Sequence, residues 1–319
     1  MKNNKMNFEE FQQAIADGVK GFLPENFDLG EIKLSVVTKN NNMKLTGLTI
    51  MRRDSIIAPT IYLEAYYKKY YEDDAELSGI MKEIVKLRME NEGPADFDVE
   101  QIRDLESCKD KIFPRLIGTQ WNEGLLNERP HMLIAGDLAV TFAIEIGECR
   151  DGSMSIPIHN RIAAEWNVTA DELYDIAMYN LETADCGVVV SMKELLRERA
   201  IAKLQMKFGD RELAENYYDN AMMLDNDMYV VTNKKKTNGA CMVLDPKTIQ
   251  RVIDMVGSDF YVLPSSIHEC IVLAWDYGSA DELKEIVMQV NEEQVDVPER
   301  LSDSVYRYTP ETGLVKAEN

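Results

Sequence analysis

The sequence contains no long hydrophobic run. No apolar stretch reaches the roughly 18 residues that a membrane-spanning helix needs. The opening residues, MKNNKMNFEEF, lack the apolar segment of a secretory signal peptide. These two absences predict a soluble, cytoplasmic protein with no membrane association.

The signatures of several common active sites are also missing. There is no GxxxxGK[ST] phosphate loop, no GxGxxG after a strand, no HExxH and no GxSxG. The three histidines are too far apart in sequence to indicate a metal site, and the five cysteines contain no CxxC pair. We therefore expect no bound metal and no cofactor.

Negative charge, by contrast, is abundant. The 319 residues carry 56 Asp and Glu against 35 Lys and Arg, a net charge of −21. Such a surface repels nucleic acid, so we expect no direct nucleic-acid binding, whereas a basic protein partner would be attracted. The stretch from Glu64 to Asp110 has 14 acids against 7 bases. That stretch either mimics nucleic acid toward a basic groove or is an ordinary solvated surface in which lysines alternate with acids.

The hydrophobic periodicity predicts an α+β fold. Apolar residues at helical spacing predict a helix over residues 7–22, and alternation predicts a hairpin of strands 32–36 and 45–51. The tyrosines Tyr62, Tyr66 and Tyr70 share one helical face. The acidic connector GPADFDVE then marks a boundary between an N-terminal part, residues 1–95, and a C-terminal α+β domain, residues 96–319.

The C-terminal part is predicted to be a mainly antiparallel sheet flanked by helices, because strand patterns occur in adjacent pairs. Capping boxes at Thr169 and Ser279 start two of the helices. Strands at residues 229–231 and 241–244 are predicted to flank TNKKKTNGA. The lysines of this tip could bind a small anion, or they could keep a hairpin end from pairing with other strands. The binding residues on the first interpretation are Thr232, Asn233, Lys235 and Gly239.

The stretch FYVLPSSIHECIVL places serines, a histidine and a glutamate between two apolar runs. On an ideal strand Ser266 and His268 would lie about 6.6 Å apart on one face, too far for a hydrogen bond. Three interpretations stay open: a structural turn, a contact site for a ligand or partner, and a catalytic turn. The catalytic interpretation uses Ser266, His268, Glu269 and Asp137, whereas the contact interpretation adds Ser265 and His131.

The order of short motifs resembles that of an uncharacterised family from Firmicutes, found in gut Clostridia and near mobile elements. The motifs are IFPRLIGTQWNEGLL, PHMLIAGDLAVTF, WNVTADELYDIAMYNL, YVVTNKKKTNGA, YVLPSSIHECIVL, ELKEIVMQVNEEQV and LSDSVYRY. The C-terminal two-thirds is also distantly similar to another uncharacterised bacillar family. No catalytic role can be carried over, because neither family has an established activity. The resemblance draws attention to Asn122, Pro130, His131, Asp137, Asn180, Thr232, Asn233, Gly239, Pro264, Ser265, Ser266, His268 and Glu269.

Together these observations favour an acidic interaction or accessory protein of mobile-element context. The alternatives are a hydrolase-like or transferase-like enzyme at the serine-histidine turn, and a sensor domain that binds a small anion. The sequence leaves the substrate, the partner and the oligomeric state open.

Overall fold

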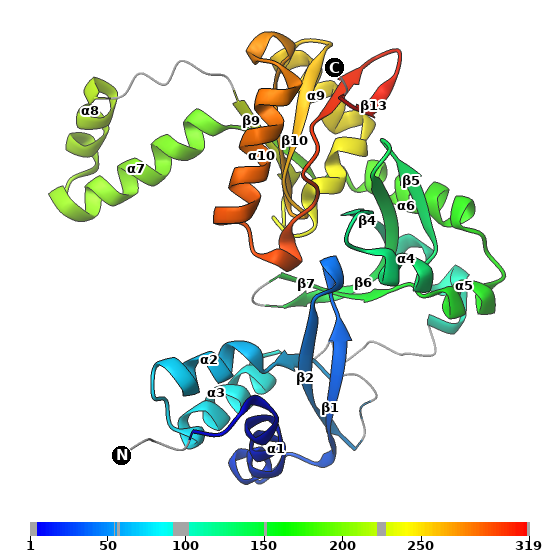
Figure 1. Ribbon diagram of the computed structural model, residues 1–319, viewed down its shortest axis with the longest axis vertical. Coiled ribbons are helices and arrows are strands. Elements are labelled where there is room, and N and C mark those ends of the chain that lie inside the picture. Colours follow the sequence, from blue (N-terminus) through cyan, green and yellow to red (C-terminus); the bar gives the residue numbers. More distant parts are fainter. Residues whose placement is uncertain are drawn as a thin grey trace.

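The computed structural model describes residues 5–53, 55, 58–91, 102–149, 152–221 and 228–317. It confirms the α+β class, since helices pack on sheets in which every described strand pair is antiparallel (Figure 1). The boundary predicted after residue 95 lies in residues 92–101, outside the described part.

Residues 5–91 form the N-terminal lobe, a three-stranded sheet with helices against one face. Its elements are α1 (Phe8–Gly18), η1 (Val19–Phe22), β1 (Leu29–Thr38), η2 (Asn40–Asn42), β2 (Lys44–Arg52), β3 (Thr60–Tyr62), α2 (Glu64–Glu72) and α3 (Leu77–Glu90). The expected first helix and hairpin are confirmed. Tyr62 belongs to β3 rather than to the predicted helical stripe, because α2 begins at Glu64. The apolar faces meet in a core of the lobe's own that includes Phe11, Leu48 and Ile84.

A four-stranded sheet follows, with α6 packed on it. The elements of this region are η4 (Leu105–Ser107), η5 (Lys109–Lys111), β4 (Ile112–Gly118), α4 (Glu123–Glu128), β5 (His131–Ile134), β6 (Leu138–Cys149), β7 (Gly152–Pro157), α5 (Asn160–Trp166) and α6 (Ala170–Ala184). The long strand β6 pairs with β4, β5 and β7. The capping box predicted at Thr169 is formed with Glu172 and starts α6.

The C-terminal region is a six-stranded sheet in the order β13-β12-β10-β11-β9-β8. Its elements are β8 (Gly187–Ser191), α7 (Met192–Phe208), α8 (Arg211–Ala221), β9 (Met228–Asn233), η6 (Gly239–Leu244), α9 (Pro246–Val256), β10 (Phe260–Ser266), β11 (Glu269–Ala274), η7 (Trp275–Tyr277), α10 (Ala280–Gln294), η8 (Val297–Glu299), β12 (Tyr306–Thr309) and β13 (Gly313–Lys316). Alternation along β10 explains the layers. Tyr261 and Leu263 pack under α10, whereas Phe260 and Val262 join the core shared with α9 and the four-stranded sheet.

The strand predicted at residues 241–244 is wrong, because that segment is the 3-10 helix η6. Its residues are nearly all buried, so a continuous apolar run was indistinguishable from a short central strand. TNKKKTNGA is consequently not a hairpin tip. It is a loop that leaves β9 and turns back into the core.

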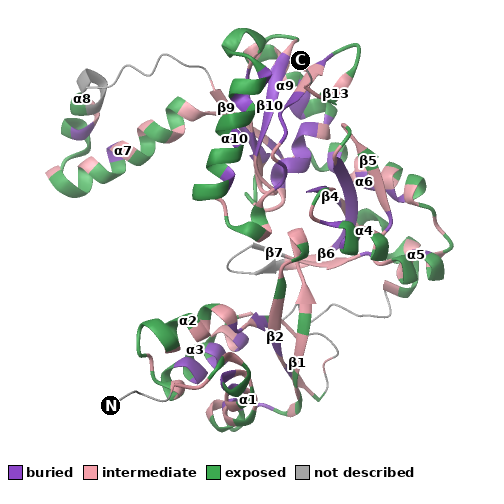
Figure 2. Cartoon of the chain, in the orientation of Figure 1, coloured by how far each residue is buried: buried purple, intermediate pink, exposed green. Residues whose placement is uncertain are grey.

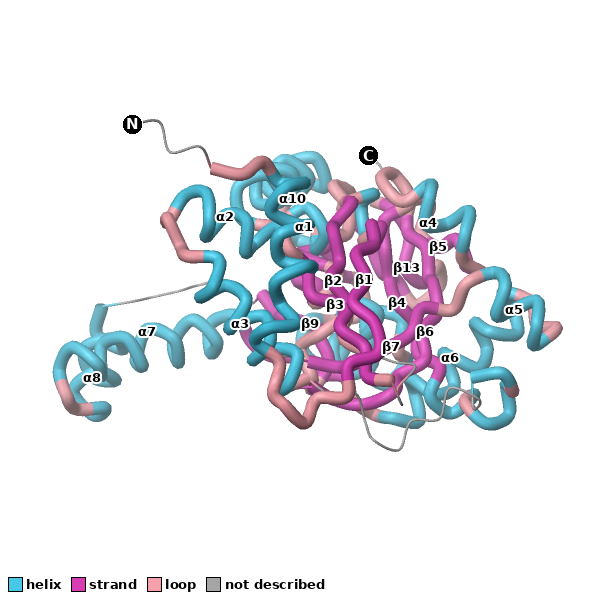
Figure 3. Tube along the Cα trace, turned by 90° about the horizontal axis from the view of Figure 1, so that it is seen from below, coloured by secondary structure: helices cyan, strands magenta, loops and turns pink. Residues whose placement is uncertain are grey.

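One helical hairpin stands away from the rest of the molecule. Helices α7 and α8, which we call the arm, are inserted between the paired strands β8 and β9 and extend sideways in two perpendicular views (Figures 1 and 3). Figure 2 shows the arm as mainly exposed, in contrast to the sheets. Its only fully buried apolar side chains in the described part are Ile201 and Ala214, which pack against each other.

Candidate functional site

The turn between β10 and β11 contacts the loop after β9, so two of the sequence motifs meet in space. Thr232 Oγ1 donates to the carbonyl of His268 at 2.8 Å, and the backbone N–H of Ala240 donates to the carbonyl of Ile267 at 3.2 Å. A Cβ on Gly239 would lie 2.6 Å from the His268 carbonyl, so only glycine allows this approach. Thr232 and Gly239, predicted as binding residues, are thus brought to His268.

The imidazole of His268 is held between a backbone amide and a carboxylate. Its Nδ1 accepts a hydrogen bond from the N–H of Asn238 at 3.0 Å, so the hydrogen of the neutral ring lies on Nε2. Nε2 faces Glu299 Oε1 at 3.6 Å. Asn238 adopts a left-handed conformation with φ 52°, which asparagine tolerates well. The ring is therefore fixed by its neighbours and is only partly open to solvent.

Ser266 is not aligned with this imidazole as a nucleophile. Its Oγ accepts from the N–H of His268 at 3.1 Å, which closes the turn. Ser265 precedes it in β10, and Glu269 pairs with Ser266 across the turn. Ser266 therefore closes the turn, and the ring of His268 beside it is paired with Glu299.

Asp137 belongs to a different cluster. Its Oδ1 accepts from the Tyr306 hydroxyl at 2.5 Å, and its Oδ2 accepts from Ser304 Oγ at 2.6 Å and Lys316 Nζ at 2.8 Å. Tyr306 is paired with Val262, four residues along β10 from Ser266, or about 13 Å. The structure does not bring Asp137 to His268.

The environment of Asp137 makes it a weak base. Burial alone raises the pKa of its carboxyl, but the hydrogen bonds from Lys316, Ser304 and Tyr306 outweigh burial and lower that pKa overall. Burial and the bond to Asp137 raise the pKa of the Tyr306 hydroxyl. Ser304 and Lys316 also line a cavity of about 230 Å³ at the start of α10. A carboxylate satisfied in this way ties β12 and β13 to the β5–β6 turn.

The lysines of the loop after β9 are largely engaged within the molecule. Lys235 Nζ bonds Glu145 Oε2 at 2.9 Å, and Lys234 Nζ donates to the carbonyl of Asp185 at 3.1 Å. Although burial raises the pKa of Glu145, the bond from Lys235 and the charge of Arg115 lower it overall. Asn233 donates to the carbonyl of Thr237 at 2.8 Å and so closes the loop. The loop is a packed structural element rather than a free cationic tip.

The N-terminal lobe meets the rest of the chain through asparagines. Asn122, fully buried, donates from Nδ2 to the side-chain oxygens of Asn40 and Asn41, both at 2.9 Å. Its Oδ1 accepts from the N–H of Asn41 at 2.7 Å. Asn40 also donates to the carbonyls of Pro298 and Arg300. The helix η8, which carries Glu299, therefore contacts both the lobe and the His268 turn.

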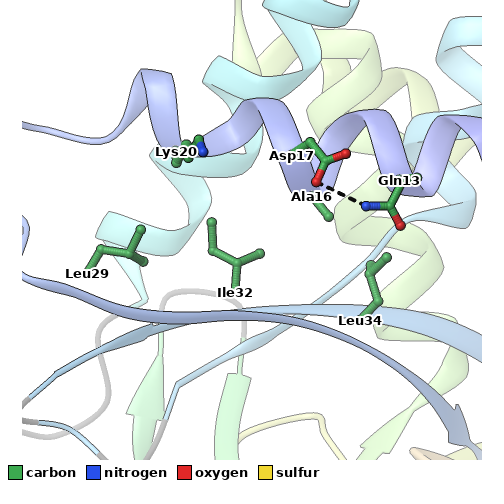
Figure 4. Close-up of a pocket in the computed structure, with 7 residues that line it drawn as sticks. All are labelled: Gln13, Ala16, Asp17, Lys20, Leu29, Ile32 and Leu34. Carbon is green, nitrogen blue, oxygen red and sulfur yellow. Dashed lines mark hydrogen bonds between the residues drawn. The ribbon is translucent and has the colours of Figure 1, made fainter.

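A shallow groove runs between α1 and β1 in the N-terminal lobe (Figure 4). It has a volume of about 420 Å³ and is lined by Gln13, Ala16, Asp17, Lys20, Leu29, Ile32 and Leu34. Leucine and isoleucine side chains rise from β1, and Gln13 bonds Asp17 at 3.0 Å along the facing helix. The side chains of Leu29, Ile32 and Leu34 thus give the groove an apolar contact surface.

His131, the remaining predicted binding residue, lies at the start of β5. Its Nδ1 is 2.9 Å from the carbonyl of Arg129, and it pairs with Thr141 rather than approaching the His268 turn. No group of three or more metal-ligating side chains occurs among the residues that the structure describes. Four cysteines, Cys108, Cys186, Cys241 and Cys270, are free thiols, and burial raises the pKa of Cys241 to about 12.

Sequence reasoning missed the main partners of these residues. Glu299 beside His268, Arg115 and Lys235 around Glu145, and Tyr306 beside Asp137 all come from distant segments. Only the Asn238-Gly239 pair carried a local signal, as a turn former. Nothing in the local pattern of the arm shows that it would project.

The architecture defines an α+β protein whose N-terminal lobe is joined to the rest of the chain by an asparagine cluster. None of its described helices is long and apolar enough to cross a membrane. The chain belongs to a family of unknown function, DUF5688, whose family model matches residues 8–310. No curated protein and no solved structure matches the chain.

Proposed function

We propose that the protein is an interaction protein that docks a partner polypeptide through the outer face of the arm. The observation that supports this proposal is the arm itself. The arm is inserted between β8 and β9, and these two strands still pair with each other at Ser191 and Tyr229. The pairing of the strands therefore does not depend on the arm. A long insertion with its own small core is expected where a scaffold carries a contact surface.

The outer face of α7 is both apolar and basic. Leu196, Arg199, Lys203, Met206 and Lys207 recur at helical spacing, and all five are exposed. Met206 is 89% exposed and Leu196 is 41% exposed. None of these five positions is an acid, and Glu198, one of the two acids of α7, pairs with Arg211 of α8 at 3.2 Å. Exposed apolar side chains rimmed by charge are typical of docking surfaces.

The charge of α7 indicates the chemistry of the partner. The helix has five basic residues and two acids, a charge of +3, in a chain of −21, so the remaining residues sum to −24. A polyanion such as nucleic acid or an anionic membrane would meet the repulsion of the acidic body. A protein with a local groove that combines carboxylates and apolar side chains fits both features of the face.

A basic partner for the helices between Glu64 and Asp110 remains a second proposal, with less support. Lysines already neutralise part of that surface: Lys69 pairs with Glu83 at 2.5 Å and Lys86 with Glu90 at 3.8 Å. An accessory role near mobile elements in Firmicutes, and a cytoplasmic location, are likewise proposals that rest on the resemblance and on the absence of targeting segments. Catalysis at His268 has less support still, since Ser266 closes the turn.

Affinity capture from the native host tests the proposal. The wild type is compared with Arg199→Glu, Lys203→Glu and Lys207→Glu combined, and with a control of equal charge change, Lys33→Glu, Lys44→Glu and Lys82→Glu. We expect one stoichiometric partner with an acidic groove, retained by the control and lost from the arm variant. A partner retained by the arm variant and lost from the control would contradict the proposal.

A further inference from the structure

The sheet of the N-terminal lobe has a long edge strand. β1 pairs with β2 and with no other described strand, so one side of it is an edge of the sheet. It has ten residues, whereas the other edge strands of the described sheets, β3, β4, β5, β7, β8 and β13, have three to seven. Proteins usually shorten or cover such edges, because an open edge can pair with another chain.

The register of the sheet shows which backbone groups face the open edge. At the hairpin end, the N–H of Lys39 donates to the carbonyl of Met43 at 2.7 Å, so the odd-numbered residues of β1 face β2. The N–H and C=O groups of Ile32, Leu34 and Val36 therefore face away from β2. Among the described residues, none forms a hydrogen bond with these groups.

The apolar groove lies beside this edge. The side chains of Ile32 and Leu34 line it from β1, and Gln13 and Asp17 line it from α1 (Figure 4). Val36 is on the same face of the strand and is 68% exposed. A strand laid along β1 would turn every second side chain toward this groove of about 420 Å³.

We propose that the edge of β1 binds an extended segment of a partner protein as a fourth strand of the lobe sheet. Main-chain hydrogen bonds to Ile32, Leu34 and Val36 hold the segment, and apolar side chains at alternate positions enter the groove. Residues 5–53 contain seven Lys and Arg against six Asp and Glu, which favours a segment of low net charge. A second copy of the chain fits less well, because each copy carries −21. The proposal does not depend on the docking function of the arm.

Peptide selection on the full-length chain tests the proposal. A phage-displayed library of random ten-residue peptides is selected on the wild type, and bound clones are compared on Val36→Thr and Val36→Pro. Threonine keeps the outward N–H, whereas proline removes it at a position where an edge strand tolerates proline. We expect clones with apolar residues at every second position that bind wild type and Val36→Thr equally. Loss of one hydrogen bond should weaken their binding to Val36→Pro by about 3- to 10-fold. Failure to recover any such clone would overturn the proposal.

Hydrogen exchange on the wild-type chain identifies the binding mode without relying on the folding of a variant. The probe is a synthetic peptide with a selected sequence. We expect the amides of Ile32, Leu34 and Val36 to exchange fast in the free chain and to become protected by the peptide. The amides of Lys33 and Ser35 face β2 and should be protected in both states. A bound peptide that leaves the three edge amides unprotected would contradict strand addition.

Light scattering of the full-length chain separates a partner segment from a second copy. We expect no dimer that depends on the edge of β1. A dimer that Val36→Pro dissociates would assign this edge to self-association and would overturn the proposal.

Discussion

The arm and the N-terminal lobe are both built from paired helices, but they use their apolar residues differently. In the lobe, α1 and α3 bury Phe11, Ile15 and Ile84 completely against the sheet. In the arm, only Ile201 and Ala214 are fully buried among the described side chains, while Met206 and Leu213 face solvent. Several apolar side chains of the arm are therefore exposed rather than packed into its own core. The buried residues of the lobe therefore maintain the fold, whereas the exposed apolar residues of the arm can contact a partner.

Polar residues divide in the same way. The Asp137 cluster, the Glu145 pairs and the His268 turn are satisfied by neighbours in the chain. Lys203 and Lys207 on the arm, by contrast, face solvent. Polar side chains that bond to neighbours in the chain contribute to stability, whereas the exposed lysines of the arm are available to a partner or ligand. Four substitutions, taken in order of decreasing effect on stability, test this division.

The largest effect should come from the lobe core. Phe11→Ala removes a fully buried ring that packs on Tyr67 and Tyr70, and we expect a loss of about 3–5 kcal/mol in the free energy of unfolding. Chemical denaturation monitored by circular dichroism measures the loss. Leu213→Ala, at a 55% exposed position of the arm, is the comparison. Similar losses in the two variants would contradict the division.

The asparagine cluster should come next. Asn122→Ala removes the acceptor of the Asn41 N–H and the donor to the side-chain oxygens of Asn40 and Asn41. We expect a loss of about 1–3 kcal/mol, because an unsatisfied buried group costs that much. Hydrogen exchange should show that protection falls first in η2 and η8. Unchanged exchange at both elements would show that Asn122 does not hold the lobe in place.

Asp137→Asn should have a smaller effect that depends on pH. The pKa of Asp137 is lower in the folded chain than in the unfolded chain, where it is about 3.9. The carboxylate therefore stabilises the fold above pH about 4, and this contribution is lost as the pH falls through the lower folded pKa. We expect the difference in unfolding free energy between wild type and variant to shrink over that range. A difference that stays constant over that range would refute the assignment.

The smallest effect on stability should come from Met206→Ala. The side chain is 89% exposed, so we expect the free energy of unfolding to change by less than about 0.5 kcal/mol. The same substitution should weaken partner capture, because an apolar anchor is removed from the docking face. Thermal unfolding and quantitative capture measure the two effects separately. If Met206→Ala destabilised the fold and left partner capture unchanged, Met206 would be a structural residue rather than a docking residue.

Local patterns predicted much of the secondary structure. The capping boxes at Thr169 and Ser279 and the hairpin of β1 and β2 all follow from short-range rules. The segment 241–244 did not, because a buried apolar run has no period that separates a short helix from a strand. A local sequence pattern does not predict the secondary structure of a segment that is buried on all sides.

The candidate sites depend on long-range contacts, which a single sequence does not show. His268 and Thr232 were singled out for two separate hypotheses; the structure places Thr232 against the His268 carbonyl, and Glu299 and Asn238 join them from other segments. Asp137 was grouped with His268 from residue type alone, whereas the pairing of β10 with β12 keeps them apart. Exposure of the arm is likewise a property of the packed fold.

Photo-cross-linking in the native host tests the central claim most directly. A photoreactive residue replaces Met206 on the arm in one strain and Leu133, 66% exposed on β5, in another. If the arm is the docking surface, we expect a single cross-linked protein from position 206 and none from position 133. The same cross-linked protein from both positions, or from 133 alone, would contradict the claim that the arm is the docking surface.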